Sequence, residues 1–286
     1  MKKQPVTVRV PATTSNLGPG FDCLGVALQM YNFITVARAE TFVAGRMARE
    51  AARGFFHAAE CEPFAFSCKI GGEVPRSRGL GSSVTIRLGV LHALNALLAR
   101  PLKRAQILAL CAGLEGHPDN AAPAEVGGFV VARNNRHQKF EIDPRLRFVL
   151  LIPGFEVKTA DARSVLPDKI DRRRAVESCG NACAITAAFA SGRYENLRGL
   201  FNDHFHQAFR ARFVPFLDRV IAAGEKAGAL GGFLSGSGSA ITCLTLRAPE
   251  KVAAAMREAS GLRAAETRVI SADNHGARLL HLTPAS

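Results

Sequence analysis

The sequence of 286 residues contains no tryptophan and only two tyrosines, and aromatic residues make up 7% of it. No basic run alternates with aromatic side chains, so the chain lacks the stacking platform that proteins binding single-stranded nucleic acid use. Its longest apolar run, residues 148–152, is far too short to span a bilayer. Neither nucleic acid nor a membrane is therefore expected as a partner.

Several short motifs are also missing. The seven cysteines show no CxxC spacing, which argues against a zinc finger and for reduced thiols in a cytoplasmic protein. The first residues, MKKQPVTVRVPATT, contain two lysines but no apolar segment, so no secretory signal is expected. No Gly-Lys pair occurs, which excludes a P-loop, and Val84 stands where a dinucleotide fingerprint needs its third glycine.

Charge is the most uneven property of the composition. Lysine and arginine number 37 against 24 acidic residues, a net charge of +13. The basic residues are scattered, with one dense cluster at 172–174, so the excess indicates anionic small molecules as readily as a solvated basic surface. A hydrophobic content of 48%, with 26 glycines and 14 prolines, predicts a globular chain of one large or two ordinary domains.

The segment from Pro75 to Leu98 carries the clearest chemistry. A turn, Arg78-Gly79-Leu80-Gly81-Ser82-Ser83, runs into a helical pattern in which apolar residues recur at three- and four-residue steps. Glycines allow the backbone N–H groups to turn toward a ligand, and the first N–H groups of the helix lack intrahelical partners. The turn is therefore a candidate phosphate site. The alternative is an ordinary loop before a helix that Ser82 or Ser83 caps.

Strands and helices are expected to interleave without a regular βαβ rhythm, which predicts an α+β fold. The polar segment 134–147 is the best candidate for a domain junction. Strands are expected at 5–10, 24–38, 64–70, 127–132, 148–152, 240–246, 266–271 and 277–282. Helices are expected at 46–60, 104–115, 175–191, 195–208, 212–227 and 249–259.

Six motifs in one order resemble those of the GHMP small-molecule kinases, and most closely the homoserine kinase subfamily. The three motifs of the wider family are PATTSNLGPGFDCLG, PRSRGLGSSV and GFLSGSGSA. The three closest to the subfamily are NLGPGFD at 16–22, which lies inside the first of these, EGHPDN at 115–120 and ARSVLP at 162–167. The resemblance implies an N-terminal domain like domain 2 of ribosomal protein S5, residues 1–147, and a ferredoxin-like C-terminal domain, residues 148–286. It also implies a cytoplasmic homodimer that phosphorylates homoserine in threonine biosynthesis, with ATP and Mg²⁺.

The same resemblance assigns the site residues. It makes Ser83 and Glu115 the Mg²⁺ ligands and catalytic groups, together with Asn120. The loop that would hold the ATP phosphates is Arg78, Gly79, Leu80, Gly81, Ser82, Ser83 and Val84. The homoserine pocket would be lined by Asn16, Asp22, His117, Asn120, Thr159, Arg163 and Arg210. Chemically, a carboxylate such as Asp22 suits the ammonium group of homoserine, and the forked guanidinium of an arginine suits its carboxylate.

Two departures from the family affect the mechanism and the nucleotide. Asn120 stands where mevalonate kinases place an aspartate, and an amide cannot accept a proton as a carboxylate does. Catalysis is therefore expected without a dedicated base, with Asp119 as the alternative. Residues 40–50 are shorter than the usual segment and lack its adenine-contacting asparagine, with 44–47 in about that place. Arg87, one turn beyond Ser83, is predicted to meet a phosphate or to face solvent.

The sequence leaves three hypotheses for function. The first is ATP-dependent phosphorylation of the side-chain hydroxyl of L-homoserine. The second is a GHMP-family kinase for another small hydroxylated metabolite, and the third is a non-catalytic nucleotide-binding relative.

Overall fold

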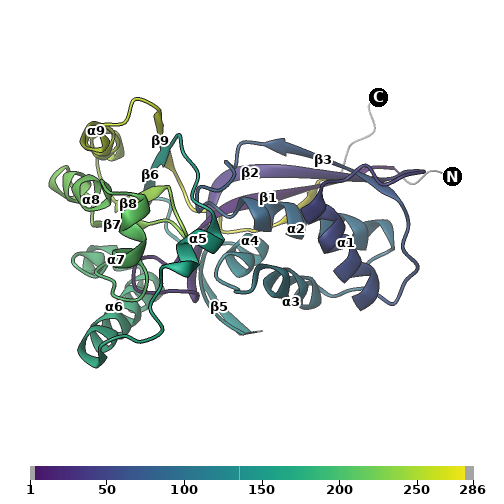
Figure 1. Cartoon of the computed structure of the whole chain (residues 1–286), viewed down its shortest axis with the longest axis horizontal. Helices are drawn as coiled ribbons and strands as arrows, with labels where there is room; N and C mark the ends of the chain where they lie inside the picture. The colour runs from purple at the N-terminus through teal and green to yellow at the C-terminus, as the bar shows by residue number, and fades with distance from the viewer. Residues whose placement is uncertain (1–3, 135, 281–286) are drawn as a thin grey trace.

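The computed structural model of the chain describes residues 4–134 and 136–280, which form two antiparallel sheets side by side (Figure 1). The first sheet has the strand order β10-β1-β2-β4-β5, and β3 also pairs with β2. Its strands are β1 (Val6–Ser15), β2 (Leu24–Arg38), β3 (Phe66–Gly72), β4 (Phe129–Arg133), β5 (Arg136–Phe140) and β10 (Arg278–Leu280). The last strand of the described chain thus returns to pair with the first.

Four helices lie against one face of the first sheet (Figure 1). They are α1 (Arg46–Ala58), α2 (Ser82–Leu97), α3 (Arg104–Glu115) and α4 (Ala121–Val126). The predicted stripe of α2 is buried, but so are Leu88 and Leu91 on its other side. A helix that is apolar all round must be covered all round, and α2 is the central helix of this half.

The second sheet has the order β7-β8-β6-β9. Its strands and the two helices that pack on them follow one another along the chain. The order is β6 (Arg147–Pro153), α8 (Leu217–Lys226), β7 (Gly231–Leu234), β8 (Ile241–Thr245), α9 (Pro249–Ser260) and β9 (Ala265–Ile270). This βαββαβ order confirms the expected ferredoxin-like arrangement. Between β6 and α8 the chain inserts α5 (Thr159–Ser164), α6 (Arg172–Ser191), η1 (Tyr194–Leu197), α7 (Gln207–Arg210) and η2 (Ala211–Phe213).

One apolar core joins the two halves. It contains Val26 and Phe129 from the first sheet, Leu150 and Phe233 from the second, and Phe189 from α6. The rings of Phe129 and Phe189 stack with their centroids 4.2 Å apart. Because this core is shared, the two walls of any site between the halves are held at a fixed separation.

Local patterns predicted most of these elements, and two predictions were wrong. The expected helix 195–208 is replaced by η1, a loop and the short α7. The strand expected at 5–10 continues to Ser15 as β1. The polar segment 134–147 contains the strand β5, and the chain passes from the first sheet to the second in the remainder of that segment, before β6. Residues 281–282 of the last expected strand lie outside the described residues. The boundary at 147/148 remains a proposal; it falls where the chain passes from the first sheet to the second.

Within residues 4–134 and 136–280, no helix is long and apolar enough to cross a membrane.

Candidate active site

One cavity of about 620 Å³ brings the expected site residues together. The loop residues Arg78 to Ser83 line it, and Val84 does not, because its side chain is buried in the core. The remaining expected residues all line the cavity: Asn16, Asp22, Glu115, His117, Asn120, Thr159, Arg163 and Arg210. These residues come from the loop after β1, the end of α3, the start of α4, α5 and α7.

The glycine loop ends at the first turn of α2. Gly81 is the N-cap in a left-handed conformation, and no side chain caps the helix. Ser82 and Ser83 are the first two helical residues, so the alternative in which one of them is the cap is wrong. This 16-residue helix starts at the cavity wall, so the N–H groups of its first turn, which lack intrahelical partners, lie beside the cavity. This arrangement favours the binding of an anion.

The glycines are needed for a second reason that the sequence did not reveal. A Cβ on Gly79 would lie 1.9 Å from the carbonyl oxygen of Ser235, and one on Gly81 would lie 2.1 Å from the hydroxyl of Thr13. Ser235 also donates its hydroxyl to the carbonyl of Gly79 (2.7 Å). The loop is therefore pressed between β1 and the loop after β7, which fixes the direction of its N–H groups.

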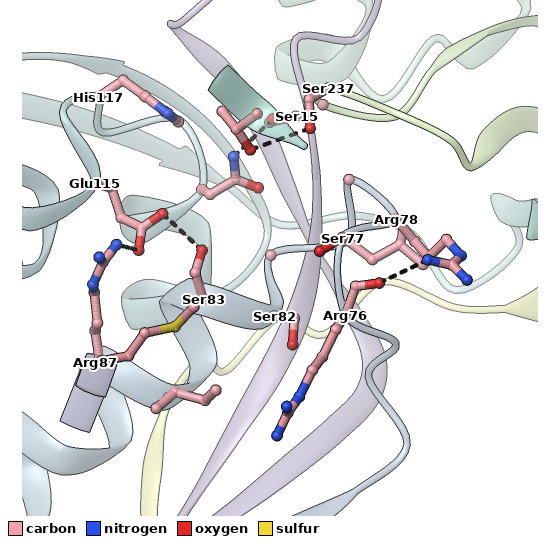
Figure 2. Close-up of a pocket in the computed structure, with 18 of the residues that line it drawn as sticks. Ser15, Arg76, Ser77, Arg78, Ser82, Ser83, Arg87, Glu115, His117 and Ser237 are labelled. Atoms are coloured by element: carbon pink, nitrogen blue, oxygen red, sulfur yellow. Dashed lines mark hydrogen bonds and ion pairs between the residues drawn. The ribbon is translucent and has the colours of Figure 1, made fainter. Parts of the chain in front are cut away.

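The side chain of Arg78, the first residue of the expected phosphate loop, is engaged by main-chain oxygens. Its guanidinium donates to the carbonyl oxygens of Pro153 (2.8 Å), Gly154 (2.9 Å) and Arg76 (3.0 Å). The bonds to Pro153 and Gly154 join the glycine loop to the end of β6 in the second sheet. Figure 2 shows the Arg78 side chain lying well away from Ser83.

Ser83 and Glu115 face each other across the cavity (Figure 2). The hydroxyl of Ser83 donates to Oε2 of Glu115 at 2.8 Å. Two hard oxygen donors this close, beside a helix N-terminus, fit a Mg²⁺ ion that also holds phosphate oxygens. Arg87 forms an ion pair with Oε1 of the same carboxylate and lines the cavity with its side chain only 15% exposed, so it does not face solvent.

A second ion pair lies at another part of the cavity wall. Arg163 donates to both oxygens of Asp22, at 2.7 and 3.1 Å. Asn16 accepts from the backbone N–H of Asp22 at 3.0 Å and donates to the carbonyl of Gly236 at 3.1 Å. Asp22 has a φ of 58°, a conformation that asparagine and aspartate tolerate better than most residues. The Asn16 side chain thus fixes the turn that presents the carboxylate.

Arg210 lies behind this pair and is almost fully buried. It donates to the carbonyls of Ala162 (3.1 Å) and Gly236 (3.0 Å). Burial, followed by the positive charge of Arg163, lowers the pKa of Arg210 to about 10. The guanidinium is still charged at neutral pH, so two positive groups and one carboxylate meet here.

The loop between α3 and α4 adds a histidine–aspartate pair. His117 Nδ1 contacts Oδ1 of the buried Asp119. Burial acts to lower the pKa of His117, but the hydrogen bond and charge of Asp119 outweigh it, and the net pKa is raised. Asp22, His117 and Asp119 place ligand-type atoms within 4.8 Å of one another, so the two carboxylates and the imidazole form one cluster in the cavity wall.

Asn120 is held by its neighbours on β1. Its Oδ1 accepts from the hydroxyl of Thr13 (2.6 Å), and its Nδ2 donates to the hydroxyl of Ser15 (2.9 Å). Thr159 begins α5, with its hydroxyl 3.4 Å from that of Ser237. An amide restrained in this way orients a substrate but takes up no proton.

The start of α1 and the end of β3 form the remaining wall. Gly45, Arg46, Met47 and Ala48 line the cavity opposite Ile70. Three of the four residues expected at about the adenine position, 45 to 47, thus line the cavity, and that they contact the base stays a prediction. Met47 and Ile70 are both about two-fifths exposed, at 42% and 41%, and offer an apolar slot for a nucleotide base.

Sequence reasoning missed the groups that support the site from a distance. Thr13, Ser15 and Ser235 hold Asn120 and the glycine loop, and Glu50 on α1 lies 3.6 Å from Arg87. Thr13 and Ser15 belong to the segment quoted as a motif, which was the one available signal. Nothing in the local pattern around Glu50 links it to a helix 37 positions away.

This combination of fold and cavity is typical of kinases that phosphorylate small molecules. The family described as "GHMP kinases N terminal domain" matches residues 44–128, and "GHMP kinases C terminal" matches residues 185–261. The chain is 34% identical to a homoserine kinase of Clostridium beijerinckii over 97% of this chain and 99% of that protein. It is 35% identical to a homoserine kinase of Moorella thermoacetica, covering 94% and 98%.

A solved structure agrees with these sequences. The crystal structure of homoserine kinase from Cytophaga hutchinsonii matches with a TM-score of 0.89 and 25% identity, covering 97% of this chain and 98% of the other. The chain therefore belongs to the GHMP kinases, and within them to the homoserine kinase subfamily.

Proposed function

We propose that the protein transfers the γ-phosphoryl group of ATP to the side-chain hydroxyl of L-homoserine, giving O-phospho-L-homoserine. The observation that carries the choice of acceptor is the Asp22–Arg163 ion pair in the cavity wall. An α-amino acid is itself a pair of opposite charges. Its ammonium group replaces Arg163 as the partner of Asp22, and its carboxylate replaces Asp22 as the partner of Arg163, so neither of these half-buried charges loses its counter-ion.

Arg210 supports the carboxylate end of this arrangement. Desolvation and the charge of Arg163 lower the pKa of Arg210, whereas the negative charges of Asp22, Asp119 and Asp203 raise it. These three carboxylates therefore make the burial of the guanidinium charge tolerable. An incoming carboxylate adds one more negative group beside two guanidinium groups. An uncharged sugar or alcohol supplies neither of these compensations, which argues against the second hypothesis for most hydroxylated metabolites.

The glycine loop and the first turn of α2 would hold the triphosphate. The backbone N–H groups of residues 81–84 are proposed to bind the phosphate oxygens, with Leu80 and Val84 contributing main chain only, since their side chains are buried. Ser83 and Glu115 would hold Mg²⁺, which supplies charge neutralisation for the transferred group. The preserved loop, hydroxyl and carboxylate argue against a non-catalytic relative.

Within residues 4–134 and 136–280, no carboxylate is hydrogen-bonded to Asn120, whose side chain contacts Thr13 and Ser15. The amide of Asn120 is restrained by Thr13 and Ser15 and orients the acceptor hydroxyl, while Asp119 is engaged by His117. We therefore propose catalysis by alignment and charge stabilisation, with the hydroxyl proton leaving late to the phosphate.

We propose further that the protein acts in the cytoplasm, as a homodimer, in threonine biosynthesis. Support for the compartment comes from the cysteines, all seven of which are free, as a reducing environment favours. Support for the pathway comes from the proposed product.

The experiment that tests the proposed function is phosphorus NMR of the reaction products. The purified protein is incubated with MgATP and, separately, L-homoserine, L-serine, mevalonate and galactose. A phosphate-monoester resonance that appears with L-homoserine and grows with ADP supports the proposal. ADP and inorganic phosphate without a monoester in any mixture would contradict it, and a stronger monoester signal with another acceptor would reassign the substrate.

A further inference from the structure

Arg87 occupies an unusual position for a cation in a site of this kind. Its Nη1 pairs with Oε1 of Glu115, whose other oxygen accepts from Ser83. Its Nη2 lies 3.6 Å from Oε2 of Glu50 on α1. The side chain is 15% exposed, and its Nε is buried with no hydrogen-bond partner among the described residues. Figure 2 shows the guanidinium and Ser83 approaching the same carboxylate.

A guanidinium and a divalent cation compete for this carboxylate. Both neutralise Glu115, and in a partly buried site two positive groups a few ångströms apart repel each other strongly. Glu50 offers the guanidinium a second carboxylate on the side away from Ser83, already at 3.6 Å and 35% exposed. Its own partner Arg46 is 88% exposed, so that pair is weak and easily exchanged.

We propose that Arg87 is a positioning residue that holds Glu115 while the nucleotide is absent and turns to Glu50 when a divalent cation arrives with ATP. The inference rests on the proposed metal site at Ser83 and Glu115. It makes the free enzyme a poor binder of metal alone, since the ion must displace an internal cation, whereas the phosphates of ATP supply negative charge that offsets the repulsion. Metal and nucleotide then bind together.

The test measures Mn²⁺ binding to the nucleotide-free protein, by the electron paramagnetic resonance signal of the unbound ion. Arg87→Leu and Arg87→Gln should bind Mn²⁺ more tightly than the unmodified protein, by about 5- to 150-fold, the usual range of coupling between sites. Glu50→Gln should bind it more weakly, because Arg87 then has no second carboxylate. In the Arg87→Leu background Glu50→Gln should have no further effect.

Two controls separate the possible failures. Arg49→Leu removes the same charge from an exposed position on α1 that does not line the cavity, and it should leave Mn²⁺ affinity nearly unchanged. Glu115→Gln in the Arg87→Leu background should abolish the gain.

If Glu115→Gln has no effect, the metal assignment fails whatever Arg87 does. If Glu115→Gln weakens binding but both folded Arg87 variants bind Mn²⁺ like the unmodified protein, the proposal for Arg87 is overturned. Circular dichroism establishes that the variants are folded, and Arg87→Gln retains the polar contact if the leucine variant does not fold.

Discussion

At the scale of single residues, the carboxylate of Glu115 is the group on which the cavity depends. It accepts from Ser83 and pairs with Arg87 while being only 9% exposed. It also ends α3, where the helix dipole disfavours negative charge. A carboxylate kept in such a position needs compensating partners, and the partners it has are those of a metal and phosphate site.

Replacing either proposed metal ligand should abolish most turnover without unfolding the protein. Ser83→Ala and Glu115→Gln each remove one oxygen donor for the ion that stabilises the transferred phosphoryl group, so kcat should fall by about 100-fold or more. The measurement is steady-state kinetics at saturating Mg²⁺, with thermal melting as the control for folding. Unaltered kcat in both variants would reassign the metal to other residues.

His206 predicts a pH dependence of stability. It is fully buried, and burial lowers its pKa to about 4, against the opposing charge of Asp203. The unfolded chain binds a proton at this residue near pH 6.5 and the folded chain does not. Stability should therefore rise as pH increases from about 4 to 6.5, because the unfolded state binds more protons in that window.

His206→Asn separates this contribution from that of other groups. The variant should lose part of the slope of Tm against pH between those limits, although it also loses the 2.8 Å hydrogen bond between His206 Nε2 and the Gly18 carbonyl. His117, whose pKa is raised, acts in the opposite direction: its contribution is complete below pH 6.5 and is lost as pH rises through the raised pKa. An unchanged slope in His206→Asn would mean that His206 is protonated in the folded protein.

At the scale of elements, the glycine loop is held by contacts that only glycine permits. Gly79 has a φ of 72°, and its Cα faces the carbonyl oxygen of Ser235. The loop after β7 and the first turn of α2 therefore move as one unit. The sequence predicted both loops as glycine-serine segments, and their mutual contact appears only in three dimensions.

Gly79→Ala should destabilise the protein and weaken nucleotide binding together. The left-handed φ costs about 1–3 kcal/mol for a residue with a Cβ, and the overlap with Ser235 adds to it. Urea unfolding and ATP binding by calorimetry measure the two effects. Gly54→Ala, in the middle of α1 with nothing within 4 Å of the added atom, should instead stabilise by up to about 1 kcal/mol. Equal effects at both positions would contradict the proposed packing.

The start of α1 predicts weak selection of the nucleotide base. The described lining of this wall, at 45–48, 70 and 76–77, offers apolar and basic side chains but no asparagine or aspartate. Apolar packing distinguishes adenine from guanine less well than paired hydrogen bonds do. ATP and GTP should therefore differ in kcat/KM by less than about a hundredfold, or 2.7 kcal/mol. A larger preference would show that the backbone or another residue reads the base.

The sequence predicted elements best where the pattern was local and regular. The expected strand 24–38 matches β2 at both ends, and the helix 104–115 matches α3. The expected helix 195–208 failed because the chain there breaks at Leu197, and Asp203 accepts from the backbone N–H groups of residues 205–207 instead. That hydrogen bonding depends on a turn that periodicity does not encode.

For the site, too, the sequence predicted some features and missed others. Motif order brought the correct residues to one cavity, but it could not say which of them pair. The pairing of Arg163 with Asp22, of Arg78 with the end of β6, and of Arg87 with Glu115 involves residues 28 to 141 positions apart. The first two contacts are fixed by the packing of the two halves and the third by the packing of α2 on α3, and no local segment contains either.

At the scale of the whole molecule, the shared core makes the cavity a rigid receptor. Phe129 and Phe189 stack across the two halves, and Arg78 ties the glycine loop to β6. The proposed phosphate end is built on α2 and α3, and the proposed acceptor end on α5, α7 and the β1–β2 loop. The net charge of +13 adds a long-range attraction for ATP and for an amino acid carboxylate.

A zwitterionic amino acid is proposed to exchange with the Asp22–Arg163 ion pair of the cavity wall. This exchange is tested by kcat/KM for L-homoserine and for 3-amino-1-propanol, its carboxylate-free analogue, in the unmodified protein and in Arg163→Lys. The lysine keeps the charge and loses the fork, so homoserine should lose roughly 2–5 kcal/mol of transition-state binding while the amino alcohol changes little. Equal losses for both compounds would contradict the claim, because Arg163 would then support the fold or the phosphates and not the carboxylate.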